Sequence, residues 1–149
     1  MDTTTATLVA WLTLAGACDL ARRQLPNGLM LAGLLGAALS LLAPAHPLDV
    51  GGLAAIAGAA GGLLLTLPAY RLRWLGGGDV KFLLVAGAWF GPRLLWVWVL
   101  GSITLGLHAL VTAHAPYAPT LPRRRLPYGS HMAVAGLAVL AAFWMKHSA

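Results

Sequence analysis

Two aspartates are the candidate catalytic residues in this sequence, because acidic side chains are very scarce in it. The chain has 149 residues and only four acidic side chains, all of them aspartates. Asp19 ends the first apolar run, and Asp79 follows three glycines at the start of a later one. Two carboxyl groups held close together do not both ionise easily, so one stays protonated while the other acts as a base toward water. Such a pair can hydrolyse a peptide bond without a metal ion or a covalent intermediate.

The composition places these aspartates in a membrane protein. Hydrophobic residues make up 59% of the chain and charged residues only 9%, against about 25% charged residues in soluble proteins. The formal net charge is +6, but the basic residues form short clusters between apolar segments, which argues against a nucleic-acid partner. We therefore expect an integral membrane protein, surrounded by the lipid bilayer, with a single domain over residues 1–149.

Apolar segments separated by polar loops predict an all-α fold with six transmembrane helices. The expected helices cover residues 3–18 with a further turn, 28–45, 50–70, 79–91, 94–113 and 127–145. As one helix, residues 82–113 would be about 48 Å long against a hydrocarbon core of about 30 Å, so we expect a reversal at Gly91-Pro92. A cleaved signal peptide over residues 3–18 is a weaker alternative, because no Lys or Arg precedes that run.

The basic residues give this topology an orientation. With six spans, one side of the membrane carries Arg22, Arg23, Arg71, Arg73, Lys81, Arg123, Arg124 and Arg125. The other side carries only Arg93 and Lys146. Lys and Arg collect in cytoplasmic loops, so both termini are expected outside. Asp19 and Asp79 then lie at similar depth near the inner interface, whereas Asp2 and Asp49 lie outside.

The remaining polar and aromatic residues favour structural roles. The glycines of the third span are expected to allow close helix packing, namely Gly51, Gly52, Gly58, Gly61 and Gly62. Four tryptophans fall toward external helix ends and are expected at the membrane interface, namely Trp89, Trp96, Trp98 and Trp144. His108 and His131 lie inside spans without other ligand candidates at suitable spacing, so we expect a helix-packing or interfacial role there and no metal or cofactor. The single cysteine, Cys18, rules out an intramolecular disulfide.

Three short motifs resemble those of a known family, the type IV prepilin peptidases. The segment Gly76-Gly77-Gly78-Asp79 is similar to the GxGD motif of that family. Asp19, followed at Leu25-Pro26-Asn27 by a hydrophobic-Pro-Asn triplet, is similar to its first aspartate motif. Pro127-Tyr128-Gly129 is similar to the triplet that opens its last span. The motifs stand in family order and extend over nearly the whole chain.

The resemblance implies an aspartic protease of the bacterial inner membrane that cuts the basic leader from a type IV pilin-like precursor at the cytoplasmic face. Asp19 and Asp79 take the positions of the two catalytic aspartates. Gly76 and Gly78 match the motif glycines and would let substrate backbone or a partner helix approach Asp79. The triplet at residues 127–129 would shape the wall of the active site or serve as a helix start.

One departure narrows the resemblance. Bifunctional members of this family carry a cytoplasmic insert with paired cysteines and also methylate the new N-terminus, whereas this chain has one cysteine and no room for such an insert. It therefore resembles the short, protease-only branch associated with Flp-type tight-adherence pili. The precursor, the bond that is cut and the oligomeric state are not implied.

Two other interpretations stay open. In a catalytically silent scaffold or assembly factor, Asp19 would pair with Arg22 or Arg23, and Asp79 with Lys81 or a nearby arginine, as interfacial ion pairs. A proton-coupled carrier would also use buried carboxylates, but both aspartates lie at one face and no acidic residue stands at mid-membrane. Substitution of either aspartate by asparagine separates a peptidase from a scaffold.

Overall fold

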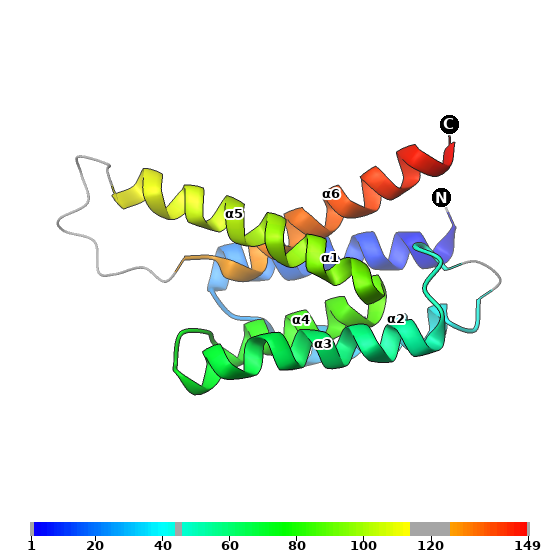
Figure 1. Cartoon of the computed structure of the whole chain (residues 1–149), viewed down its shortest axis with the longest axis horizontal. Helices are drawn as coiled ribbons and strands as arrows, with labels where there is room; N and C mark the ends of the chain where they lie inside the picture. Colours follow the sequence, from blue (N-terminus) through cyan, green and yellow to red (C-terminus); the bar gives the residue numbers. More distant parts are fainter. Residues whose placement is uncertain (1, 44–45, 114–125, 149) are drawn as a thin grey trace.

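The computed structural model describes residues 2–43, 46–113 and 126–148, and these residues form helices and turns without a strand (Figure 1). The chain order is α1 (Thr3–Arg22), α2 (Asn27–Ser40), α3 (Gly52–Arg71), α4 (Gly77–Phe90), the short 3-10 helix η1 (Gly91–Arg93), α5 (Leu94–Ala113) and α6 (Tyr128–Ser148). The all-helical class that the sequence predicts is confirmed. The helix expected over residues 28–45 already ends at Ser40, where Leu42 N–H donates to the Leu39 carbonyl (3.0 Å) and closes a turn.

Four helical stretches in the described parts of the chain are long and apolar enough to cross a membrane. They are α1, α3, the continuous stretch Gly77–Ala113 and α6, while α2 is a shorter apolar helix. Large apolar side chains are also exposed along the outer faces of these helices, for example Leu53 of α3 (83% exposed) and Val111 of α5 (71% exposed). An exposed apolar surface of this extent is compatible with lipid and not with water. The protein is therefore a multi-pass membrane protein, and a crossing by each of the six helices stays a prediction.

The expected reversal at Gly91-Pro92 is confirmed. The stretch Gly77–Ala113 is interrupted by η1, and α5 runs back along the bundle from there (Figure 1). Gly91 has a φ of +55°, a left-handed conformation that side-chain-bearing residues rarely adopt. Pro92 has no N–H to continue the α-helical ladder, so the two residues end α4 for local reasons.

The core of the bundle is built around α4, which is buried over most of its length. Its largest buried side chains are Phe82, Trp89 and Phe90, and they pack with Leu8 and Leu12 of α1. α4 packs against α2 and α3, while α6 packs against α1 and α5. The catalytic candidate at the beginning of α4 is thus attached to the most enclosed helix of the protein.

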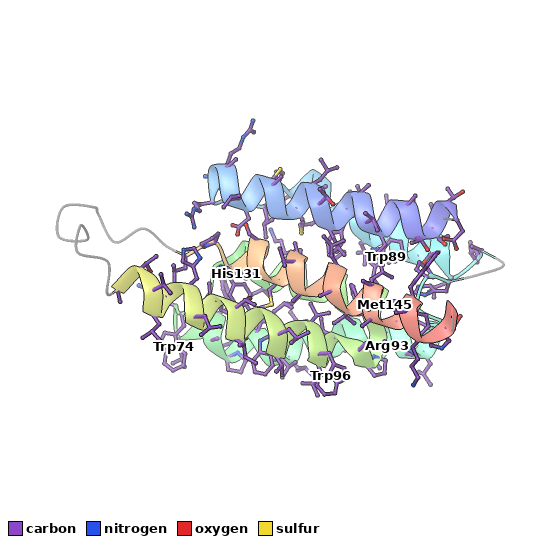
Figure 2. All side chains as sticks on the ribbon, turned by 90° about the horizontal axis from the view of Figure 1, so that it is seen from above. Trp74, Trp89, Arg93, Trp96, His131 and Met145 are labelled. Carbon is purple, nitrogen blue, oxygen red and sulfur yellow. The ribbon has the colours of Figure 1, made fainter. Side chains whose placement is uncertain are left out.

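Two tryptophans fix α2 to this core by hydrogen bonds to its carbonyl groups. Trp11 Nε1 donates to the Leu29 carbonyl (3.1 Å), and Trp89 Nε1 donates to the Gly33 carbonyl (2.9 Å). The interface role expected for Trp89 is wrong, because its side chain is fully buried (Figure 2). Trp98 also packs against the core, whereas Trp96 is 64% exposed and Trp144 is 41% exposed. An indole can pack its ring in a core when its N–H finds an acceptor, and both buried indoles do so.

Glycines bring the backbones of α3 and α4 into direct contact. A methyl group at Gly58 would overlap the Gly87 carbonyl, and one at Gly62 would overlap the Leu83 carbonyl. These two glycines of α3 follow the small-xxx-small spacing and confirm the expected packing role. For Gly51, Gly52 and Gly61 that expectation is wrong, since nothing described lies within 4 Å of an added methyl group.

The two ends of the bundle differ in what they contain. The N-terminus and the end of α6 lie together at one end, and the α1–α2 connection, the α3–α4 connection and the beginning of α6 lie together at the other (Figure 1). Asp19 near the end of α1 and Asp79 near the beginning of α4 therefore come to the same end, as their expected depth requires.

Candidate active site

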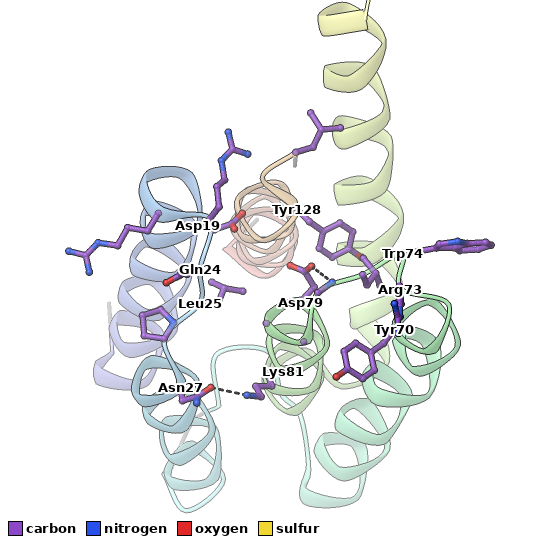
Figure 3. Close-up of a pocket in the computed structure, with 18 of the residues that line it drawn as sticks. Asp19, Gln24, Leu25, Asn27, Tyr70, Arg73, Trp74, Asp79, Lys81 and Tyr128 are labelled. Atoms are coloured by element: carbon purple, nitrogen blue, oxygen red, sulfur yellow. Dashed lines mark hydrogen bonds between the residues drawn. The ribbon is translucent and has the colours of Figure 1, made fainter. Parts of the chain in front are cut away.

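Asp19 and Asp79 line the same cleft, which has a volume of about 1360 Å³ (Figure 3). The cleft opens at the end of the bundle where α1 ends and α4 and α6 begin. Gly76, Gly78 and Tyr128 also line it, so most of the sequence-predicted site residues meet there. Pro127 and Gly129 are buried next to Tyr128, at the beginning of α6.

Asp79 is positioned by its own helix. It is the third residue of α4, and its Oδ2 accepts a hydrogen bond from the N–H of Gly76, the N-cap residue (3.1 Å). The carboxylate therefore satisfies one of the N–H groups that a helix start leaves without a partner, and it lies at the positive end of the helix dipole. The side chain is half-buried, so it is in reach of water in the cleft.

Asp19 is positioned by a helix that comes much later in the chain. It is only 6% exposed, and its Oδ2 accepts hydrogen bonds from the backbone N–H of Ser130 (2.9 Å) and from Ser130 Oγ (3.2 Å). Ser130 is the third residue of α6, so this carboxylate caps the start of α6. Asp19 lies near the C-terminal end of α1, where a negative charge is unfavourable, and the positive end of the α6 dipole offsets that cost.

The hydroxyl of Ser130 links α1 to α6 at two points. Besides its contact with Asp19, its Oγ donates to the Gly16 carbonyl at 2.9 Å. A hydroxyl has one proton, so it cannot donate to both acceptors at once. The Ser130 side chain therefore connects the Asp19 carboxyl group with the backbone of α1.

The glycines of both motifs leave room for the carboxylates. An added methyl group at Gly129 would lie 3.2 Å from Asp19 Cγ, and one at Gly76 would lie 3.2 Å from Asp79 Oδ2. At Gly78 it would lie 3.4 Å from Cβ of Leu25, in the α1–α2 connection. Gly129 and Gly78 therefore permit close approach of a second chain segment. Gly76 instead contacts Asp79, the aspartate of its own helix.

Pro127 and Tyr128 frame the beginning of α6. The carbonyl of Pro127 accepts from the N–H of His131 (3.3 Å), which is the first bond of the helix, and Pro127 itself lacks an N–H that would need a partner. The half-buried Tyr128 lines the cleft together with Asp79 (Figure 3).

Two of the charged residues near the cleft have hydrogen-bond partners that are not charged. Asp19 accepts from Ser130, and Lys81 Nζ donates to Asn27 Oδ1 of α2 (2.8 Å). The basic side chains that line the cleft are Arg22, Arg23, Arg71, Arg73 and Lys81. Arg123, Arg124 and Arg125 lie outside the described residues.

Ser130 is the site residue that sequence reasoning missed. A serine directly after a motif has no distinctive signal, and its contact with Asp19 depends on how α6 packs on α1. Its position three residues after Pro127, a helix-start signal, would have marked its N–H as one that needs an acceptor.

His108 and His131 connect α5 to α6, as expected for helix packing. His108 Nδ1 lies 2.9 Å from His131 Nε2, and His131 Nδ1 lies 3.1 Å from Thr104 Oγ1. The Thr104 hydroxyl donates to the Gly101 carbonyl (3.0 Å), so His131 Nδ1 is the donor to Thr104 and His131 Nε2 accepts from His108. No cluster of three or more His, Cys or Asp side chains suited to a metal ion occurs within the described residues.

Fold and cleft together define a polytopic helical membrane protein with two carboxylates from separate helices in one cavity. The chain matches the type IV leader peptidase family over residues 6–111, which is most of its length and includes both aspartates. It belongs to that family and is thereby placed among the proteases, and its substrate class is a pilin-like precursor. The match ends before residues 127–129. No significant match was found among curated proteins or among solved structures.

Proposed function

We propose that the protein is an aspartic endopeptidase that removes the basic leader from a pilin-like precursor, with Asp19 and Asp79 as its catalytic residues. Family membership supplies the protease class. The observation that carries the aspartic mechanism is that Asp19 of α1 and Asp79 of α4 line one cleft, each at the N-terminus of a helix.

The two aspartates act as a pair toward one water molecule. The ionised carboxylate accepts a proton from the water while its oxygen attacks the scissile carbonyl carbon, and the protonated carboxyl donates its proton to the carbonyl oxygen. When the tetrahedral intermediate collapses, the C–N bond breaks, the leaving nitrogen receives the proton that the first carboxylate took from the water, and the proton on the former carbonyl oxygen returns to the second carboxyl group. The proton belongs to the two carboxyl groups as a pair, so it is not assigned to one of them.

The distribution of basic residues supports cleavage at the cytoplasmic face of the bacterial inner membrane. Five basic side chains line the catalytic cleft, whereas Arg93 and Lys146 lie toward the other end, where the described chain begins and ends. Loops rich in Lys and Arg stay in the cytoplasm. With all six helices crossing the bilayer, both termini are then external and the cleft meets the substrate where its apolar helix leaves the membrane.

The substrate is a small precursor of the Flp type, and the product is not methylated. This part of the proposal rests on the single cysteine of the sequence, Cys18. The paired cysteines and the insert that accompany N-methylation in longer relatives have no counterpart in this sequence.

A cleavage assay in membranes tests this function. The chain is co-expressed with a Flp-type precursor from the same source, and wild type is compared with Asp19→Asn and Asp79→Asn by the size shift of the precursor. Asp49→Asn is the matched control: Asp49 lies in the α2–α3 connection with a φ of +50°, which asparagine also tolerates, and it should cut like wild type.

We expect both cleft variants to insert into the membrane and to lose cleavage. If either variant still cuts at the wild-type rate, that aspartate is not catalytic. If wild type itself does not cut the precursor, either the natural substrate is a different precursor or the scaffold alternative replaces the peptidase.

A further inference from the structure

A second cavity lies between α5 and α6, toward the end of the bundle opposite the catalytic cleft. It has a volume of about 500 Å³, and its floor and walls are apolar, formed by Leu100, Ala138, Val139 and Ala142. Ala138 and Ala142 are one helical turn apart on α6, so their small side chains leave a channel along the helix. The cavity faces outward from the bundle, toward the surroundings of the helices.

The mouth of this groove is cationic. Arg93, Lys146 and His147 line it, and none of the described residues that line it is acidic. Arg93 and Lys146 are the two basic residues that the sequence places away from the cytoplasmic side, and the fold brings both to this one groove. Both basic residues outside the cytoplasmic side thus line one cavity, which suggests that they bind the same ligand.

Arg93 is held firmly in this place. One of its terminal nitrogens donates to the Leu48 carbonyl (2.7 Å), and the guanidinium carbon lies 4.7 Å from the centre of the Phe143 ring. The guanidinium has five N–H donors, so further donors are available to a ligand. Trp96 borders the groove on α5 with 64% of its surface exposed, on the same side of the bundle as Arg93 (Figure 2).

We propose that this groove binds one anionic phospholipid of the external leaflet. The phosphate is bound by Arg93 and Lys146, and an acyl chain lies in the channel over Ala138 and Ala142. Charge complementarity selects the anionic head group, because each basic side chain near a membrane surface attracts an anionic lipid. Trp96, with an apolar ring and a polar N–H, suits the boundary between head group and acyl chain.

Lipid retention by the purified full-length chain tests the site. The protein is exchanged into mixed micelles with phosphatidylglycerol or phosphatidylcholine, and the bound lipid is counted by native mass spectrometry. Lys146→Gln should weaken phosphatidylglycerol retention about fivefold, which corresponds to about 1 kcal/mol, and weaken phosphatidylcholine retention less, because the positive choline group offsets the charge of the phosphate. Lys146→Arg should retain phosphatidylglycerol, and Ala142→Phe, which fills the channel, should weaken both lipids.

Arg73→Gln is the control for a general charge effect, since Arg73 is an exposed basic residue at the opposite end. If Arg73→Gln lowers phosphatidylglycerol retention as much as Lys146→Gln does, the preference comes from net charge and the site is refuted. If Ala142→Phe changes no lipid retention but dissociates a dimer, the groove binds a second copy of the chain. Thermal unfolding without added lipid checks that each variant is folded.

Discussion

Asp19 is buried and held by a distant helix, whereas Asp79 is half-buried and held by its own helix. The position of Asp79 follows from the few residues around Gly76, because a helix that begins there presents its third side chain to the N-cap N–H. The position of Asp19 exists only when α6 packs against α1. Local sequence thus positions Asp79, whereas a tertiary contact positions Asp19. Substitutions of neighbouring residues should therefore change the cleavage rate differently at the two aspartates.

Among changes to the neighbours of the two aspartates, the largest expected effect is at Gly129. In Gly129→Val the new side chain meets the Asp19 carboxyl, which has no free space because it is buried between α1 and α6. Displacing a catalytic group by about 1 Å can lower a rate about 100-fold, and we expect a loss of this size in precursor cleavage. Gly106→Val on α5 is the matched control, since nothing described lies within 4 Å of its added methyl group. Equal rates for the two variants would contradict the close packing at Asp19.

The corresponding change beside Asp79 should cost much less. In Gly76→Ala the methyl group meets only the carboxylate of Asp79, a side chain that can rotate in the cleft. The φ of Gly76 is −78°, which alanine adopts without strain. We expect about a threefold to tenfold lower cleavage rate, measured with the same precursor. A loss as large as that of Gly129→Val would show that Asp79 is as tightly enclosed as Asp19.

Removal of the Ser130 hydroxyl separates its two contacts with Asp19. Ser130→Ala keeps the backbone N–H that donates to Asp19 at 2.9 Å and removes the hydroxyl donor. One hydrogen bond contributes about 1 kcal/mol, so cleavage should fall about fivefold. Ser102→Ala on α5 removes a hydroxyl outside the cleft and should leave the rate unchanged. An unchanged rate in Ser130→Ala would assign the positioning of Asp19 to the backbone N–H alone.

The smallest effect concerns stability at the end opposite the cleft. Burial lowers the pKa of His46, whose Nδ1 accepts from the N–H groups of Leu48 (3.2 Å) and Val50 (3.3 Å). A base with a lowered pKa in the folded state stabilises the protein above its unfolded pKa of about 6.5, and this contribution is lost as the pH falls below that value.

The measurement is the midpoint of thermal unfolding between pH 7.5 and pH 5. Wild type should lose stability over this range, and His46→Asn, which keeps an acceptor but does not titrate, should show a flatter profile. Precursor cleavage by His46→Asn at neutral pH should match wild type, because the cleft lies at the other end. If the stability of His46→Asn depends more steeply on pH than that of wild type, His46 does not lower stability at acidic pH and the prediction is contradicted.

The helices and their order were predictable because the sequence has apolar runs with clear interruptions. Gly91-Pro92 ends α4 for local reasons, and the family motifs of Asp19 and Asp79 predicted two side chains that line one cleft. Tertiary contacts were not predictable in the same way. Trp89 looks like an interface residue from its place near a helix end, but the Gly33 carbonyl accepts its N–H inside the core. Ser130 depends on the packing of α6 against α1, which no local pattern encodes.

The most direct test of the aspartate pair is the rate of precursor cleavage in a cycle of Asp19→Asn, Asp79→Asn and the double variant. Residues that act as one unit have non-additive effects, so the double variant should be no slower than either single variant. Each single variant should fall to the same residual rate, with all proteins inserted at equal levels. Losses that multiply in the double variant, or a single variant that still cuts at the wild-type rate, would contradict a shared catalytic role.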